Sequence, residues 1–324
     1  MALPRVSILI PTYNRADYLL AALDSALHQT FSELEIIVVD DGSMDDTAEV
    51  IRKYTDPRLQ FIQQKNCGVS AALNTAWRAA RSEFIAMLGS DDEMLPAQIE
   101  TLLNYIEREP TLGMVYGRAQ AMDAQGNSLP QIYGSPPKFP NDSLQSILYA
   151  NCVCSIAALI RRALVEQVGG FDENLVANED WDLWIRLAKH CQFGFCDEIL
   201  ARYRLHPQSL TGSRSAQYQN VLAGRIRLIE RYFESPQVPP NALAIKRLAL
   251  RNVYMDATIR YLTIGNRRAA FSTFLRALGS GSNPFSTALR VAGVALFDLY
   301  LSKTTWGVRF ADTLVKQRRA ALNR

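Results

Sequence analysis

The alternation of short apolar runs with segments of helix length constrains the fold more than any other feature of this sequence. VSILI (residues 6–10), EIIVV (35–39) and FIAML (84–88) are each followed by a stretch long enough to form a helix. Strands that are apolar at nearly every position are buried on both faces, and repeated strand–helix alternation is typical of a mainly parallel sheet. The sequence therefore predicts an α/β, Rossmann-like fold with helices flanking the sheet.

A second block of elements follows a Pro-rich segment, YGSPPKFPND (residues 133–142). We expect this segment to be a loop over one end of the sheet, where lids and substrate loops tend to lie. The later pattern predicts a helix over NEDWDLWIRLAKH (178–190) and then a long strand. From about residue 217 the pattern is helical. The sequence thus indicates a sheet-based domain at 1–215, with halves at about 1–120 and 121–215, and a C-terminal helical region at 216–324.

The charge of the chain is divided unevenly along its length. With 324 residues, 48% of them apolar, it can bury a full core as one large domain or two. The net charge is only +3, but residues 221–324 hold 17 lysines and arginines against 5 acids, and the first 220 residues hold 18 against 27. This basic C-terminal part is consistent with an anionic neighbour, and equally with a solvated face that balances the acidic half.

The cysteines and the apolar runs indicate a cellular compartment. The five cysteines show no zinc-site spacing, and we expect free buried thiols in a reducing environment. VSILIP near the N-terminus is much shorter than the apolar region of a secretory signal, and VAGVALF (291–297) is too short to cross a bilayer. We therefore expect a cytoplasmic protein, with a peripheral position at the inner face of the membrane left open.

Polar residues directly follow three of the predicted strands. The segments are PTYNR, DDGS and GSDD. Ligands bind beyond the carboxyl ends of the strands in an open parallel sheet, so adjacent strands would bring Tyr13, Asp40, Asp41, Asp91 and Asp92 to one edge. Neighbouring carboxylates repel each other, and burying either one without a partner is unfavourable. The Asp91–Asp92 pair therefore requires a positive partner.

Five motifs in order resemble those of the family 2 inverting glycosyltransferases, which have the GT-A fold. They are VSILIPTYNR, QTFSELEIIVVDDGSMDDT, NCGVSAALNTA, LGSDDEM and NEDWDLWIRLA. The similarity covers residues 4–207, about two thirds of the chain. It implies a nucleotide-binding half at about 1–120 and an acceptor half at about 121–215. No G-x-G-x-x-G motif follows a strand, which argues against a dinucleotide-binding site.

The resemblance implies roles for the residues after the first two strands. Pro11, Thr12 and Tyr13 match the loop that holds the nucleotide base, with the Tyr13 ring available for stacking. The alternative is that Tyr13 only closes the sheet edge. Asp41 matches the acid that accepts hydrogen bonds from the edge of the base. We expect Asp40 to hold its own loop instead.

Asn66, Gly68 and Ser70 match a turn and helix start close to the nucleotide. A helix N-terminus is itself favourable to phosphate. By the same resemblance, Asp91 would bond the ribose of the donor.

The second role of the Asp91–Asp92 pair is metal binding. Consecutive residues in an extended chain point in opposite directions, so we do not expect the two carboxylates to bind one ion equally. The resemblance implies that Asp92 ligates Mg²⁺ or Mn²⁺ beside Asp91, and a hard cation suits carboxylate and diphosphate oxygens. This ion would be the positive partner. Many relatives carry an acid two residues before Asp91, where this chain has Gly89, which argues against an extra ribose or metal contact.

His206 follows the last predicted strand, and two arginines lie near the end of that strand. In many relatives a histidine at a comparable place reaches the metal or the diphosphate, and a purely structural His206 is an equal alternative. Arg202 and Arg204 alternate along that strand, and the pattern favours a surface position for them over neutralisation of phosphate.

NEDWDLW supplies the candidate catalytic residues. Asn178 is expected to cap a helix whose first turn carries Glu179 and Asp180. Acids there commonly only complement the helix dipole, but the resemblance implies that Asp180 is the general base and that Glu179 contacts the acceptor or tunes the base. Trp181 and Trp184 are expected to pack in the core.

The resemblance implies a glycosyltransferase that moves a sugar from a nucleotide-diphosphate donor, with a UDP-sugar favoured, to an acceptor hydroxyl with inversion. The product would be a polysaccharide, glycolipid or cell-surface glycan, and the acceptor a glycan or a lipid-linked sugar. We expect no nucleic-acid partner. The basic C-terminal helices leave two neighbours open, an anionic membrane surface and a second subunit.

Two alternative functions belong to other classes of protein. A catalytically degenerate nucleotide-sugar binding module or assembly subunit is kept open by Gly89. A nucleotidyltransferase on a related fold would carry a Gly-rich basic loop after its first strand, and PTYNRADY lacks one.

Overall fold

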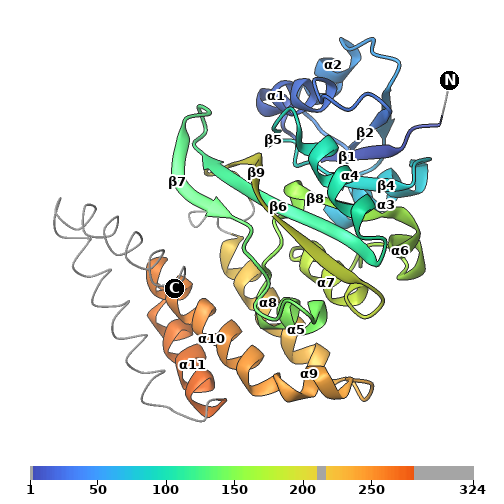
Figure 1. Ribbon diagram of the computed structural model, residues 1–324. Coiled ribbons are helices and arrows are strands. Elements are labelled where there is room, and N and C mark those ends of the chain that lie inside the picture. The colour runs from blue at the N-terminus through green and yellow to red at the C-terminus, as the bar shows by residue number, and fades with distance from the viewer. Residues whose placement is uncertain (1–2, 210–216, 281–324) are drawn as a thin grey trace. The chain divides into compact units, whose positions relative to one another are not determined.

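The computed structural model describes residues 3–209 and 217–280. The chain divides into two compact units, residues 1–224 and 225–324. The first unit contains a nine-stranded sheet with the order β3-β2-β1-β4-β8-β6-β9-β5, and β7 pairs with β6. The strands are β1 (Val6–Thr12), β2 (Leu34–Asp40), β3 (Leu59–Gln63), β4 (Phe84–Met87), β5 (Glu93–Met94), β6 (Leu112–Met122), β7 (Ser128–Tyr133), β8 (Ala158–Arg161) and β9 (Gln192–Arg204) (Figure 1).

Helices join most of these strands. Those of the first unit are α1 (Ala16–Leu27), α2 (Thr47–Arg52), α3 (Val69–Ala79), α4 (Gln98–Arg108), α5 (Ser143–Tyr149), α6 (Arg162–Gln167) and α7 (Glu179–Leu187). β3, β2, β1 and β4 run parallel, as do β6 and β9, whereas β8 is antiparallel to both of its neighbours. The predicted α/β fold with a mainly parallel sheet flanked by helices is confirmed.

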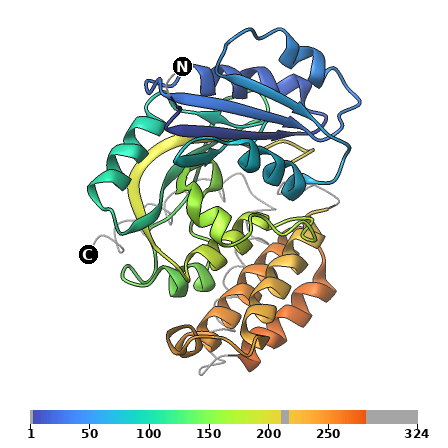
Figure 2. The same ribbon diagram turned by 90° about the vertical axis from the view of Figure 1, so that its right-hand side faces the viewer.

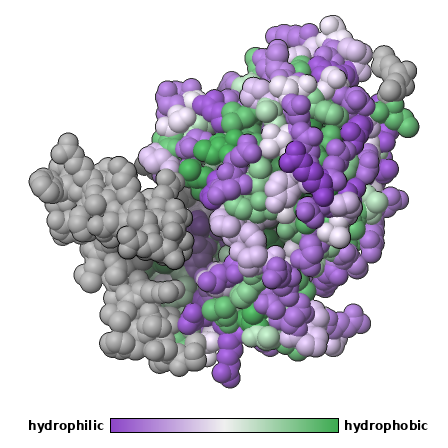
Figure 3. Space-filling view, in the orientation of Figure 1, coloured by the Kyte–Doolittle hydropathy of each residue, from purple (hydrophilic) through white to green (hydrophobic). Residues whose placement is uncertain are grey.

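Both faces of the sheet are covered (Figure 2). Val6, Ile8 and Ile10 of β1 belong to one buried cluster with residues of α1 and α4. The alternate residue Leu9 points to the opposite face and is also fully buried. There α3 packs on β1 and β2 with a run of small residues, which lets the helix approach the sheet closely. On the surface in Figure 3, hydrophilic residues are interspersed with small apolar patches.

The second unit is helical in its described part. The last part of α8 (Tyr218–Glu234) is followed by α9 (Pro240–Ala244), α10 (Lys246–Thr263) and α11 (Arg267–Gly279). The Thr258 hydroxyl lies 2.9 Å from the Thr273 hydroxyl, which joins α10 to α11. Among the described helices, none combines the length and the apolar character that a membrane span needs. The apolar run at 291–297 lies outside the described residues.

The five cysteines are free thiols, as expected. Cys152, Cys154 and Cys196 are buried, and Cys191 is half-buried. The expectation of burial is wrong for Cys67, which is exposed in the loop before α3.

Candidate active site

The carboxyl ends of β2, β1 and β4 lie at one edge of the sheet. β1 is parallel to both neighbours, with Thr12 opposite Asp40 and Leu9 opposite Met87. The three polar segments that follow these strands therefore begin side by side, as the strand pattern predicts.

Asp41 holds the loop that precedes α3. Its buried carboxylate accepts hydrogen bonds from the backbone N–H of Cys67 (2.9 Å) and of Gly68 (2.8 Å), and from the Gln64 side chain (2.8 Å). Three donors leave about one of the four lone-pair positions for a ligand. Asp40 accepts from the Ser43 N–H (2.9 Å) and so holds its own loop, as expected.

The other predicted nucleotide residues differ in exposure. Tyr13 is 40% exposed, so its ring is available for stacking. Thr12 is buried, and its hydroxyl oxygen finds no partner among the described residues. Asn66 and Gly68 are exposed, whereas the buried Ser70 donates to the Leu175 carbonyl at 3.3 Å. Pro11 is half-buried beside them in β1.

Asp91 and Asp92 lie in a turn. The Asp92 N–H donates to the Gly89 carbonyl at 3.0 Å, so the expectation of an extended chain with opposed carboxylates is wrong. A Cβ atom added to Gly89 would lie under 3.0 Å from Asp92 Oδ2 and 3.1 Å from Asp91 Oδ1. One oxygen of each acid therefore reaches the same small space, and that space exists because residue 89 has no side chain.

Three basic residues lie around this turn. His206 Nε2 lies 2.8 Å and Arg15 Nε 3.6 Å from Asp91 Oδ2, and the Arg204 backbone N–H donates to Asp92 Oδ1 at 2.8 Å. Burial alone would raise the pKa of Asp91, but the His206 hydrogen bond and the Arg15 charge bring it below its usual value. Burial, and then the Asp91 charge, raise the pKa of Asp92 well above its usual value. The His206 hydrogen bond and the Arg15 charge therefore favour the charged form of Asp91, whereas Asp92 lacks enough positive charge nearby to offset its burial.

The turn fits a hard divalent cation only in part. Within residues 3–209 and 217–280, no group of three His, Cys, Asp or Glu side chains is placed to hold a metal ion without other ligands. The two convergent carboxylates of Asp91 and Asp92 are nevertheless suitable ligands, and diphosphate oxygens of a donor would complete the shell. His206 lies in contact with Asp91, and its Nδ1 atom has no partner among the described residues.

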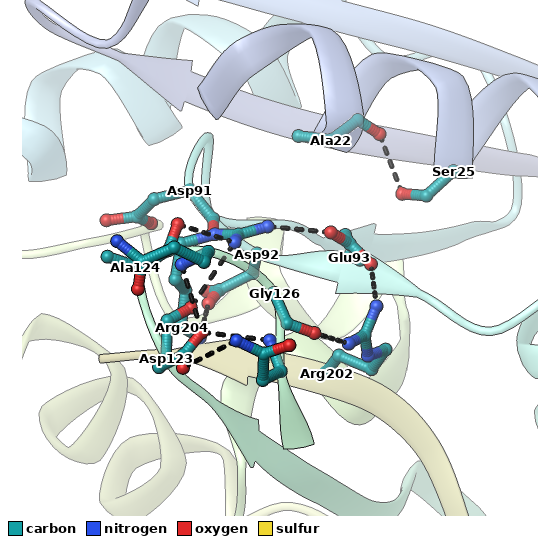
Figure 4. A network of polar contacts seen from close by, with 12 residues as sticks. Ala22, Ser25, Asp91, Asp92, Glu93, Asp123, Ala124, Gly126, Arg202 and Arg204 are labelled. Atoms are coloured by element: carbon teal, nitrogen blue, oxygen red, sulfur yellow. Dashed lines mark hydrogen bonds and ion pairs between the residues drawn. The ribbon is translucent and has the colours of Figure 1, made fainter. Parts of the chain in front are cut away.

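Arg204 is not a surface residue. It is 5% exposed, and its Nε donates to the Asp91 carbonyl at 2.7 Å. The expected surface position is therefore wrong, because the turn carrying Asp91 and the β6–β7 hairpin cover this end of β9 (Figure 4). Arg202 is half-buried and pairs with Glu93 at 2.6 Å.

The N-terminus of α7 brings the candidate base to the same region. Asp180 accepts from the Trp181 N–H at 2.6 Å and from the Asn151 side chain at 3.4 Å. Burial raises the pKa of the Cys154 thiol, and the charges of Asp92 and Asp180 raise it further. The charges of the candidate metal ligand and of the candidate base therefore both reach this one buried thiol.

Glu179 and Asn178 precede Asp180. Burial, and then the Asp180 charge, raise the pKa of the half-buried Glu179 to about 7. The predicted cap at Asn178 is wrong: this residue adopts a left-handed conformation (φ 65°) and makes no capping hydrogen bond. Its amide donates instead to the Val221 carbonyl at 3.1 Å. Trp181 and Trp184 are buried, as expected.

The Pro-rich segment at 133–142 is tied to the sheet. Tyr116 donates to the Ser135 carbonyl at 3.0 Å, and Arg118 to the Gly134 carbonyl at 3.2 Å. Both donors belong to β6, so the start of this loop is fixed beside the strand.

The chain matches known proteins over this region. Residues 7–169 match the family model for glycosyl transferase family 2. Chondroitin synthase of Escherichia coli is 32% identical over 208 residues, which cover 64% of this chain and 30% of the length of that relative. The chain belongs to glycosyl transferase family 2, as its motifs predict.

Two solved structures have the same fold. The structure of S. aureus TarS 1-349 in complex with UDP-GlcNAc matches with a TM-score of 0.63 and 20% identity, covering 91% of this chain and 85% of that chain. The mannosyltransferase PcManGT from Pyrobaculum calidifontis, in complex with GDP-Man and Mn²⁺, matches with a TM-score of 0.62 and 20% identity, covering 98% and 87%. The predicted GT-A fold is confirmed.

Two residues near the site were not predicted from the sequence. Arg15 faces Asp91, and its position directly after PTYN, at the same sheet edge, was a usable signal. Asn151 contacts Asp180 from a loop that precedes β8, and no local pattern indicates this contact.

Proposed function

We propose that this protein transfers a sugar from a nucleotide-diphosphate donor, with a UDP-sugar favoured, to an acceptor hydroxyl with inversion at the anomeric carbon. The observation that carries the proposal is the convergence of Asp91 and Asp92 on the space beside Gly89, at the sheet edge where β1, β2 and β4 end. Ligands bind at that edge of an open parallel sheet. A pair of carboxylates there suits a metal-bound diphosphate.

The donor would be held by the loops at this edge. Tyr13 offers its exposed ring to the base, and Asp41 offers its remaining acceptor position to a base N–H. The complex of TarS with UDP-GlcNAc supports a uridine donor, whereas the complex of PcManGT contains GDP-Man. Asn66, Gly68 and Ser70 would lie near the nucleotide, and Asp91 would bond the ribose.

Asp91 and Asp92, with His206 beside them, would hold Mg²⁺ or Mn²⁺. When bound, the ion would supply positive charge to the diphosphate leaving group. The Mn²⁺ in the PcManGT complex supports this proposal. Arg15 adds a fixed positive charge 3.6 Å from Asp91.

Asp180 would take the proton from the acceptor hydroxyl as that oxygen attacks the anomeric carbon. The Trp181 N–H donates to one oxygen of Asp180 at 2.6 Å, and the Asn151 amide lies 3.4 Å from the other. With a pKa of about 7, Glu179 would be partly protonated near neutral pH, and it could donate a hydrogen bond to the acceptor.

Replacing the base tests this function. Asp180→Asn should retain nucleotide-sugar binding and lose transfer by about two orders of magnitude or more. Asp182→Asn is the matched control, because Asp182 lies on the same helix and pairs with Arg186 at 2.8 Å instead. Parent-like transfer by Asp180→Asn would refute the assigned role. Mn²⁺-dependent UDP binding without hydrolysis or transfer to any acceptor would favour a binding module over an enzyme.

We also propose that the second unit contacts a lipid surface through α11. α11 carries Arg267, Arg268 and Arg276 and no acid, and on the same helix Phe271 is 63% and Leu275 50% exposed. An exposed apolar stripe bordered by arginines complements an anionic lipid surface.

Vesicle sedimentation tests the lipid contact. The protein should bind phosphatidylglycerol vesicles and not phosphatidylcholine vesicles, and Phe271→Asp should weaken that binding roughly tenfold. Leu20→Asp, at a residue 45% exposed on α1, should bind as the parent does. Equal binding to both kinds of vesicle, or binding to neither, would contradict the proposal.

A further inference from the structure

The Arg204 side chain makes hydrogen bonds to several residues around the proposed site. It ends β9, is 5% exposed, and its guanidinium lies 5.1 Å from the centroid of the Tyr18 ring. A buried guanidinium is unfavourable unless its N–H groups find acceptors. The acceptors of Arg204 belong to two segments that are distant in sequence, as Figure 4 shows.

The first segment is the turn that carries the acid pair. Arg204 contacts three consecutive residues there: its backbone N–H donates to Asp92 Oδ1 (2.8 Å), Nε donates to the Asp91 carbonyl (2.7 Å), and Nη2 donates to Glu93 Oε1 (2.6 Å). In the described part of the chain, the Arg204 N–H is the only protein group that donates to the Asp92 carboxylate. Arg204 therefore fixes both the backbone and one carboxylate of this turn.

The second segment is the turn between β6 and β7, residues 123–127. Arg204 Nη1 lies 3.4 Å from the Asp123 carbonyl and 3.3 Å from the Ala124 carbonyl. Arg202 donates to the Gly126 carbonyl and, at 2.6 Å, to Glu93 Oε2. Glu93 therefore joins two guanidinium groups, and both of them reach the hairpin turn.

The hairpin turn has an internal structure of its own. The half-buried Asp123 accepts through its carboxylate from the backbone N–H of Gln125 (3.0 Å) and of Asn127 (2.8 Å). These bonds curl the turn so that its carbonyls face the guanidinium groups. Arg204 thus contacts both the hairpin turn and the turn that carries the acid pair.

We propose that Arg204 is a positioning residue that couples the β6–β7 hairpin turn to the Asp91–Asp92 turn, so that metal binding orders the hairpin and an ordered hairpin strengthens metal binding. Coupling of this kind is reciprocal by thermodynamic necessity. The metal half of this inference rests on the proposed function. A lysine cannot replace Arg204, because an ammonium group cannot reach acceptors on both segments from one position.

The experiment measures Mn²⁺ affinity by electron paramagnetic resonance with UDP present, and hydrogen exchange of residues 123–127 with and without Mn²⁺. We expect Mn²⁺ with UDP to slow exchange of the hairpin in the parent protein. Arg204→Lys should lower Mn²⁺ affinity about tenfold and remove that protection. Arg58→Lys is the matched control, because Arg58 also makes a two-pronged pair, with Asp56, and should leave both measurements unchanged.

A second variant keeps Arg204 intact. Asp123→Ala removes the carboxylate that accepts from two N–H groups of the hairpin turn and so loosens this turn, and by reciprocity it should lower Mn²⁺ affinity about threefold or more. It also tests the coupling if Arg204→Lys does not fold. Parent-like Mn²⁺ affinity in a folded Arg204→Lys, or in Asp123→Ala, overturns the inference and leaves the proposed function standing. A parent protein that binds no Mn²⁺ with UDP contradicts both.

Discussion

Adding a methyl group at Gly89 should disturb the proposed metal site directly. The added Cβ would lie under 3.0 Å from Asp92 Oδ2 and 3.1 Å from Asp91 Oδ1, both inside van der Waals contact. Asp92 cannot simply turn aside, because its other oxygen is held by the Arg204 N–H at 2.8 Å. Overpacking of a tight site costs about 1–3 kcal/mol, so Gly89→Ala should lower the free energy of unfolding by about that amount. Mn²⁺ affinity in the presence of UDP should fall about tenfold.

Urea denaturation and a Mn²⁺ titration provide the two measurements for Gly89→Ala. Gly279→Ala is the control, because nothing lies within 4 Å of the added Cβ and the change to alanine should be neutral or slightly stabilising. Gly89→Asp should be worse than Gly89→Ala, since it adds a third negative charge beside an acid whose pKa is already raised. If Gly89→Ala unfolds at the parent's urea concentration and binds Mn²⁺ equally well, the proposed crowding of the two carboxylates is refuted.

Three further predictions concern the remaining acids. The pKa of Glu179 is raised to about 7, so the folded state holds its proton more tightly, and this contribution to stability is lost as pH rises from about 4.5 through 7. The free energy of unfolding of Glu179→Gln, relative to the parent, should therefore rise by about 2 kcal/mol from pH 5 to pH 8 in urea denaturation series, and an equal difference at both pH values would contradict this. Asp41→Ala leaves two loop N–H groups without their acceptor, and should weaken UDP binding at least tenfold in calorimetry; unchanged affinity would exclude the loop role. Glu35 is buried far along the sheet and is bonded to Arg81. Glu35→Gln should lower the free energy of unfolding by about 2 kcal/mol, and a folded sample of it should have the parent's transfer activity.

The position of the site could be predicted because it depends on simple sheet geometry. Three apolar strands that are parallel and adjacent must end at one edge, so polar residues directly after them meet there. That argument requires no side-chain detail, and the ends of β1, β2 and β4 do lie at one edge, as it predicts.

The course of the backbone around the acid pair was predicted incorrectly from the preceding strand. GSDD contains Gly, Ser and Asp, which are turn formers, and that local signal was available in the sequence. The outcome depends on one hydrogen bond, from the Asp92 N–H to the Gly89 carbonyl. The same turn explains why residue 89 is glycine, which the motif comparison treated only as a missing acid.

The burial of Arg204 could not be read from alternation along its strand. Its acceptors lie 80 and more residues away, and the two-residue strand β5 that covers this edge of β9 is too short for a periodic pattern. Tertiary pairing, and not local sequence, therefore decides which face of this strand end is open to solvent.

The donor that holds Asp92 is a main-chain amide, and this has an evolutionary consequence. Nineteen of the common amino acids would present the same N–H at position 204. Substitutions at position 204 can therefore weaken the side-chain contacts with the β6–β7 hairpin turn step by step, while Asp92 keeps its hydrogen bond to the backbone N–H. Only a substitution by proline would remove this hydrogen bond at once, because proline has no backbone N–H.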